Sequence, residues 1–302
     1  MDYNEILRGQ LADYKDRNKL TDADLGRELG FGATRINKYL NLFKDGHVPE
    51  PDVDEIEKRA ADVLKGAERR QANRVRLFPT AITGKIGRYL EDIRRTNDVG
   101  LVSGPAGVGK TCAAELYAAD NPTAVLLTVL CWKRNSQAMT RLLFDAVDHA
   151  TCPSNKSHAD WLEEWFKGSN RLLIVDNAHK LGLTGVEYLF DFHDTTGVPI
   201  ALIGNPEVLK TIRRSDQWTS RIGLCREVKM DPKTADAIAG GLATQLTPDS
   251  GKELLGEAVS VTNNAGHARA LKKQLVLCRE MNGSDGWLKT FKAAGLLLLK
   301  PA

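Results

Sequence analysis

The sequence is poor in the residues that build disulfide frameworks and zinc sites. It has five cysteines, an odd number with no C-x-x-C pair, which argues against both and for a reducing compartment. Apolar runs such as Leu296–Leu299 are far shorter than the ~18 residues that a membrane span needs. The start of the chain, Met1 to Glu5, is polar and acidic. We therefore expect no signal peptide, no membrane contact and a cytoplasmic protein.

A large excess of charge of either sign is also absent. The formal net charge of +3 on 302 residues is too small to indicate a nucleic-acid-binding protein by itself, so any basic surface must be local. What the chain does have is apolar residues, 42% of the total, which is enough for packed cores. Its length suits about two domains.

The strongest motif is a phosphate-binding loop of the form G-x-x-x-x-G-K-T. An apolar run, Val99–Ser103, precedes it as an expected strand, and a helix-forming run, Cys112–Ala119, follows it. In such loops backbone N–H groups face a phosphate chain at a helix N-terminus. We expect Lys110 to reach the β- and γ-phosphates of ATP and the Thr111 hydroxyl to ligate Mg²⁺. The expected nucleotide contacts are Gly104, Pro105, Ala106, Gly107, Val108, Gly109, Lys110, Thr111 and Cys112, with Ile82 and the nearby chain as an adenine wall.

A second motif, L-L-I-V-D-N-A-H, spans Leu172–His179. Four apolar residues followed by Asp176 predict a buried strand. The carboxylate at the end of this strand would hold Mg²⁺ through water. The next residue is usually a glutamate that activates the attacking water, but this chain has Asn177. An amide can orient a water and cannot take its proton, so we expect slow ATP hydrolysis. His179 is either a substitute for the glutamate or a surface histidine.

Three further positions match those at which AAA+ ATPases carry functional side chains. Asn205 follows an expected strand, as a sensor 1 residue does, although an Asn-Pro turn is the alternative. Arg221 lies where an arginine finger would reach a neighbouring subunit, with Arg213 and Arg214 as competitors. Arg269, at the start of a long helix, occupies the sensor 2 position over the nucleotide, or is a solvated helix arginine.

The chain is expected to begin with a helix-turn-helix domain. Thr21 would cap one helix, Gly26 would let a second helix cross closely, and Gly30 would take a positive φ in the turn. A repressor-like helix-turn-helix would turn a set of polar residues toward a DNA groove, and the alternative is a helical hairpin for protein contacts. That set is Thr34, Arg35, Asn37, Lys38 and Asn41, with Lys44 near a phosphate.

The remaining pattern alternates near-continuous apolar strands with helices, which predicts a parallel sheet covered on both faces. The expected fold is α/β, a P-loop AAA+ three-layer parallel sheet with a small C-terminal helical lid, preceded by the all-α domain. We place these parts at residues 1–65 for the helix-turn-helix domain, 66–78 for a basic linker, 79–229 for the AAA+ core and 230–302 for the lid.

The motifs taken together, over nearly the whole chain, resemble the MuB-like family of AAA+ ATPases of phage DNA transposition, which is related to TnsC-type regulators. The resemblance implies ATP-dependent, largely non-sequence-specific binding to double-stranded DNA and assembly as a ring or helical filament. It also implies target selection and activation of a transposase in a bacterial or phage-infected cell. Lys133 and Arg134, after the second strand, match the pore-facing DNA contacts of such proteins.

Two other functions share the nucleotide motifs. One is a AAA+ replication initiator or helicase loader, which would recognise a defined origin sequence. The other is an ATP-gated transcription regulator with no meaningful turnover, which Asn177 favours and Arg221 disfavours.

Overall fold

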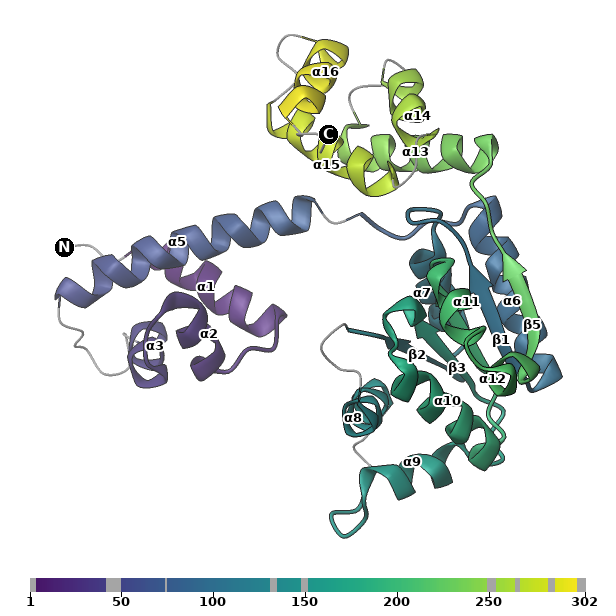
Figure 1. The fold of residues 1–302 in the computed structure, drawn as a ribbon. Helices are drawn as coiled ribbons and strands as arrows, with labels where there is room; N and C mark the ends of the chain where they lie inside the picture. The colour runs from purple at the N-terminus through teal and green to yellow at the C-terminus, as the bar shows by residue number, and fades with distance from the viewer. Residues whose placement is uncertain are drawn as a thin grey trace. The chain divides into compact units, whose positions relative to one another are not determined.

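The computed structural model describes residues 4–41, 50–73, 75–130, 135–147, 152–248, 254–263, 267–281 and 286–297. The chain forms two compact units, Met1–Arg74 and Val75–Ala302 (Figure 1). Helix α5 (Glu50–Ala72) covers the first half of the expected basic linker. This stretch is helical because residues 67–72 are alanine, glutamate, arginine and glutamine, all strong helix formers.

The first unit packs α1 (Glu5–Arg17), α2 (Asp22–Leu29) and α3 (Ala33–Leu40) against α5. Thr21 caps α2 in a reciprocal capping box with Asp24. Gly30 ends the helix with a φ of +75°. A Cβ on Gly26 would lie 2.5 Å from the Phe31 carbonyl oxygen, so only glycine lets the turn pass this closely. The tight connection between α2 and α3 therefore depends on both glycines.

The second unit is built on a sheet of five parallel strands: β1 (Val99–Ser103), β2 (Ala124–Thr128), β3 (Leu172–Asp176), β4 (Ile200–Gly204) and β5 (Ile222–Glu227). Their order across the sheet is β2-β3-β4-β1-β5. All strands are parallel, so their carboxyl ends meet at one edge, where ligands bind in folds of this kind. The predicted fold class is confirmed.

Helices cover both faces of the sheet. One face carries α8 (Ser136–Ala146), α9 (His158–Phe166), α10 (Leu183–Thr196) and α11 (Glu207–Ile212). The other face carries α6 (Ala81–Thr96) and α7 (Lys110–Asp120) (Figure 1). Successive residues of β3 enter opposite cores: Leu173 and Val175 face α8–α11, and Leu172 and Ile174 face α6 and α7. Every residue of β1, β3 and β4 is buried, as a central strand of a three-layer fold requires.

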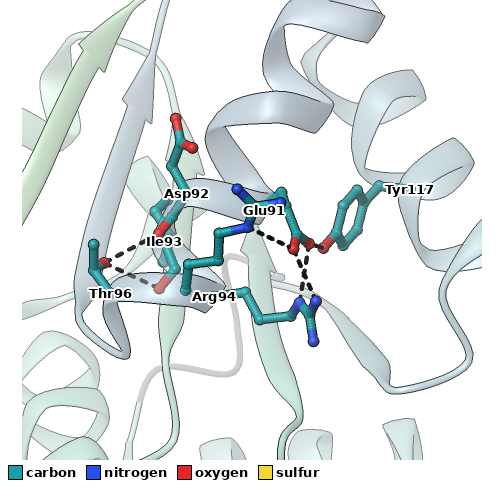
Figure 2. A network of polar contacts seen from close by, with 7 residues as sticks. Glu91, Asp92, Ile93, Arg94, Thr96 and Tyr117 are labelled. Carbon is teal, nitrogen blue, oxygen red and sulfur yellow. Dashed lines mark hydrogen bonds and ion pairs between the residues drawn. The ribbon is translucent and has the colours of Figure 1, made fainter.

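A polar network joins α6 to α7 (Figure 2). The Glu91 carboxylate accepts hydrogen bonds from the Arg94 guanidinium at 2.8 and 2.9 Å and from the Tyr117 hydroxyl at 2.9 Å. These contacts, the Arg94 hydrogen bond first, lower the pKa of Glu91 to about 2. Burial and the Glu91 contact raise the pKa of Tyr117 to about 12. The network fixes the helix that precedes β1 against the helix that follows it.

The chain ends in a helical lid of α13 (Pro232–Leu246), α14 (Leu255–Asn263), α15 (His267–Glu280) and α16 (Trp287–Leu297) around one apolar core. The segment before α6 runs along α13: the Arg76 N–H donates to Gln245 Oε1 at 2.7 Å, and Gln245 Nε2 donates to the Arg76 carbonyl at 3.2 Å. A Cβ on Gly241 would lie 2.5 Å from the Phe78 ring, so this ring packs directly on the α13 backbone. Within the described part of the chain, no helix combines the length and apolar character of a membrane span.

Candidate nucleotide-binding site

The loop between β1 and α7 has the backbone of a phosphate cradle. Gly107 and Gly109 have φ values of +82° and +96°, which residues other than glycine rarely adopt. A Cβ on Gly104 would lie 2.4 Å from the Val228 carbonyl oxygen, so the loop also needs glycine where it leaves the sheet. Helix α7 begins at Lys110, and its first N–H groups have no partner within their own helix. They are available to an anion at this edge of the sheet.

Lys110 is 8% exposed and folds over this loop. Its Nζ donates to the carbonyl oxygens of Gly104 and Pro105, both at 2.8 Å, and to Asn205 Oδ1 at 3.4 Å. Burial lowers the pKa of Lys110, and the negative charge of Asp176 opposes the shift. The buried ammonium therefore has hydrogen-bond acceptors but little compensating charge, which a polyanion would supply.

Thr111 and Asp176 meet beside the lysine. The Thr111 hydroxyl, on the first turn of α7, donates to Asp176 Oδ2 at 2.8 Å, and Asp176 at the end of β3 is 2% exposed. Hydroxyl and carboxylate oxygens are ligands that Mg²⁺ accepts, so the donor set fits this ion. Among the described residues no cluster of three His, Cys, Asp or Glu side chains forms a metal site. Mg²⁺ held here would complete its shell with phosphate and water oxygens.

Asn177 starts a short turn in the left-handed region, with φ 58° and ψ 32°. The turn, η2 (Ala178–Lys180), is closed by the Lys180 N–H, which donates to the Asn177 carbonyl at 2.8 Å. It carries His179 to β4, where the ring Nδ1 accepts from the backbone N–H of Asn205 at 3.4 Å. The sequence did not reveal this contact, because the two residues are 26 positions apart. Asn205 thus lies between His179 and Lys110.

A cavity of about 310 Å³ opens beside the loop. Its walls come from the segment before α6, the start of α6, the loop itself and two lid helices, and burial raises the pKa of the Cys112 thiol there. Of the expected adenine wall, Phe78, Thr80 and Thr83 line the cavity, and Ile82 lies in the core beneath Gly109 at 3% exposure, because α6 turns it toward the sheet. The lining residues are Val75, Arg76, Leu77, Phe78, Thr80, Thr83, Gly107, Gly109, Cys112, Ile238, Leu242, Ala268 and Lys272.

The lid contributes a cation to this cavity, Lys272, that the sequence did not single out. Ala268 and Lys272 are four positions apart and lie on one face of α15, toward the nucleotide site. Arg269, the predicted sensor 2, belongs to the same helix, but its side chain lies outside the described residues. Helical spacing from Gly266 alone could not show which basic residue of α15 lines the cavity.

Arg221 lies at the amino-terminal ends of the strands, whereas the loop lies at their carboxyl ends. It ends α12 (Asp216–Ser220) and directly precedes β5, whose Ile222 pairs with Val99, the first residue of β1. The loop follows the last residue of β1, so about 20 Å of sheet separates the two along the strand direction. Arg221 Nη2 forms an ion pair with Asp194 Oδ2 of α10 at 2.9 Å. Its competitors Arg213 and Arg214 are exposed at the end of α11.

The predicted DNA contacts of the first unit differ in exposure. Lys38 is exposed on α3, whereas Arg35 is half-buried with Cζ 4.7 Å from the centre of the Phe31 ring. Asn37 Nδ2 donates to Asp22 Oδ2 at 2.8 Å, which places an acidic side chain beside this face. The predicted contacts Lys133 and Arg134, and Lys44, lie outside the described residues.

Comparison with known proteins agrees with this geometry. Residues 93–212 match the AAA domain family. The Mu-like prophage FluMu DNA transposition protein B of Haemophilus influenzae is 27% identical over 292 residues, which cover 92% of this chain and 97% of that protein.

Two solved structures share the fold. Cdc6p from Pyrobaculum aerophilum has a TM-score of 0.57 at 16% identity, covering 77% of this chain and 72% of that chain. Domain III of the Thermotoga maritima replication initiation protein DnaA has a TM-score of 0.50 at 18% identity, covering 76% and 96%. The AAA domain and the likeness to FluMu protein B over almost the whole chain together support a MuB-like AAA+ ATPase.

Proposed function

We propose that this protein binds double-stranded DNA of any sequence in an ATP-dependent manner, assembles on it as an oligomer or helical filament, selects the transposition target and activates a transposase. The support for transposition is the near-full-length likeness to FluMu DNA transposition protein B. The support for ATP dependence is the meeting of Lys110, Thr111, Asp176 and Asn205 at one edge of the sheet.

Each residue of this site would have a separate role at the bound nucleotide. Lys110 would exchange its loop carbonyls for the β- and γ-phosphates, which gives its buried charge a counter-charge. Thr111 and Asp176 would hold Mg²⁺, which neutralises phosphate charge when bound. Asn205 is placed to orient a water, and Asn177 cannot act as a proton acceptor. The cavity lined by Phe78, and by Lys272 in the lid, suits the base and ribose.

Arg221 is proposed as the residue that makes turnover depend on assembly. Its distance from its own phosphate loop excludes a role at that site in the same subunit. An arginine that stabilises charge on a neighbour's phosphates links hydrolysis to the interface between subunits. On DNA, repeated subunits would then align Lys38, Lys133, Arg134 and other basic groups along the phosphate backbone.

The experiment compares DNA binding of the full chain in ATP, in ADP and without nucleotide, by fluorescence anisotropy on several random duplexes, with electron microscopy of the ATP sample. We expect binding at least about tenfold tighter in ATP, equal on all duplexes, and assemblies only with ATP and DNA. Lys110→Ala should abolish the ATP effect. Lys85→Ala, which removes an exposed cation of α6, is the matched control and should keep it.

Two outcomes would overturn this function. Nucleotide-independent binding to one defined sequence would favour an initiator-like protein, and ATP binding without assembly on DNA would favour an ATP-gated transcription regulator. The likeness to DnaA and Cdc6p does not favour the initiator, because at 16–18% identity it shows the fold alone.

A further inference from the structure

The turn after β3 brings a histidine onto the end of β4. Gly204 has no side chain at the point of contact: a Cβ there would lie 3.0 Å from the His179 backbone nitrogen and 3.5 Å from its Nδ1. Contacts of 3.0 Å are tighter than packed side chains normally allow, so the close approach depends on this glycine. His179 is thereby set against the first residue beyond β4, which is Asn205.

The hydrogen bond at this contact decides what the imidazole can do. His179 Nδ1 accepts from the Asn205 backbone N–H, so in the neutral ring the proton resides on Nε2. Burial lowers the pKa of His179, which favours this neutral form. One nitrogen is then occupied as an acceptor and the other already carries a proton. Neither offers a lone pair to a water, so the arrangement does not suit a general base.

The same contact suits a different role, which is to hold Asn205 in place. The Asn205 carboxamide on the far side of the residue accepts from Lys110 Nζ at 3.4 Å. A backbone held at one end and a side chain held at the other can take few orientations. We propose that His179 is a positioning residue that holds the backbone of Asn205, so that the carboxamide stays beside Lys110 and the phosphate site. This inference rests on the proposed function, because it assigns Asn205 a role in ATP turnover.

The first test needs no nucleotide. Nitrogen-15 correlation spectra of the imidazole rings in the full chain, assigned by loss of one ring in His179→Asn, report the tautomer of His179. We expect a proton on Nε2 and an acceptor at Nδ1. A proton on Nδ1 in the native protein would overturn the proposal, whatever the enzyme does with ATP.

The second test uses paired substitutions. Asparagine places its amide oxygen where histidine carries Nδ1, so His179→Asn keeps an acceptor for the Asn205 N–H, and His179→Ala removes it. The bond is long, so we expect His179→Ala to lower kcat only about fivefold to tenfold, with ADP affinity unchanged. His179→Asn should restore most of that loss. Thermal unfolding of both variants would show that they fold.

The outcomes separate the competing roles. A base at His179 predicts that Asn and Ala lose activity equally, by about hundredfold or more, and that result would overturn the positioning role. Equal activity of all three proteins would also overturn it. If the wild-type chain binds ADP but shows no turnover, the proposed function fails, and the tautomer measurement still decides the geometry.

Discussion

The residue after Asp176 offers the sharpest test of how the local backbone and the chemistry of this site are linked. Asn177 has a left-handed backbone, with φ 58° and ψ 32°, and it begins the turn that carries His179 to Asn205. Asparagine tolerates this conformation better than most residues, because its short side chain can bond locally. Replacement by glutamate would supply the missing proton acceptor and strain the backbone at the same time.

The magnitude follows from the dihedral angles. A left-handed conformation costs roughly 1 kcal/mol or more for an ordinary side chain, so Asn177→Glu should lower the free energy of unfolding by about 1 kcal/mol. For a unit of this size that corresponds to a melting temperature lower by about 2–4 °C. Turnover should rise at least about tenfold, because a positioned general base typically contributes a factor of about 10² to 10⁴.

Thermal denaturation without nucleotide and steady-state phosphate release measure the two effects. Asn177→Gln is the matched control, because it has the strain of glutamate and no proton acceptor: it should melt like the glutamate variant and hydrolyse ATP no faster than wild type. If both variants melt at the wild-type temperature, the backbone explanation is wrong. If the glutamate variant is no faster, the lack of a base does not limit turnover.

Three other substitutions probe separate parts of the molecule. Glu91→Gln should lower stability by about 1–2 kcal/mol at neutral pH in denaturant titrations, after allowance for solvent screening. Because the pKa of Glu91 falls from 4.5 in the unfolded chain to about 2, its contribution is present above pH 4.5 and lost as the pH drops toward 2; a constant difference across that window would refute the reasoning. Gly204→Ala should cost about 1–3 kcal/mol, since its methyl group meets the His179 backbone; unchanged urea unfolding would count against the close approach. Arg221→Ala should change stability by less than about 1 kcal/mol, because its ion pair with Asp194 is partly exposed, yet reduce DNA-stimulated hydrolysis; full activity of the variant would remove Arg221 from the list of candidate fingers.

The phosphate loop and its surrounding elements were predictable because their signals are local. The strand Val99–Ser103 was predicted with its observed bounds. Lys110, Thr111 and Asp176 were singled out from residue type and spacing alone, and the structure brings them together at the ends of β1 and β3. The parallel, three-layer arrangement followed from the length and apolar character of the strands.

Contacts between distant segments were not predictable in this way. Nothing in the pattern around His179 indicates that its ring meets Asn205, because that contact depends on β3 lying next to β4 and on a left-handed turn. The place of Lys272 likewise depends on how the lid helices pack, which hydrophobic periodicity does not fix. Ile82 is a related case: the phase of α6 against the sheet turns its side chain into the core beneath Gly109, whereas the neighbouring Thr80 and Thr83 line the cavity.

The placement of Arg221 at the sheet edge opposite the phosphate loop has a consequence for growth of any assembly. If one subunit's arginine completes the next subunit's site, every joint is head-to-tail, and such joints close into a ring or continue without limit. An open filament would have two unlike tips, one with an incomplete ATP site and the other with an arginine that serves no partner. Turnover would be slowest at the first tip, so a nucleotide cap would persist there and give the filament a direction along DNA.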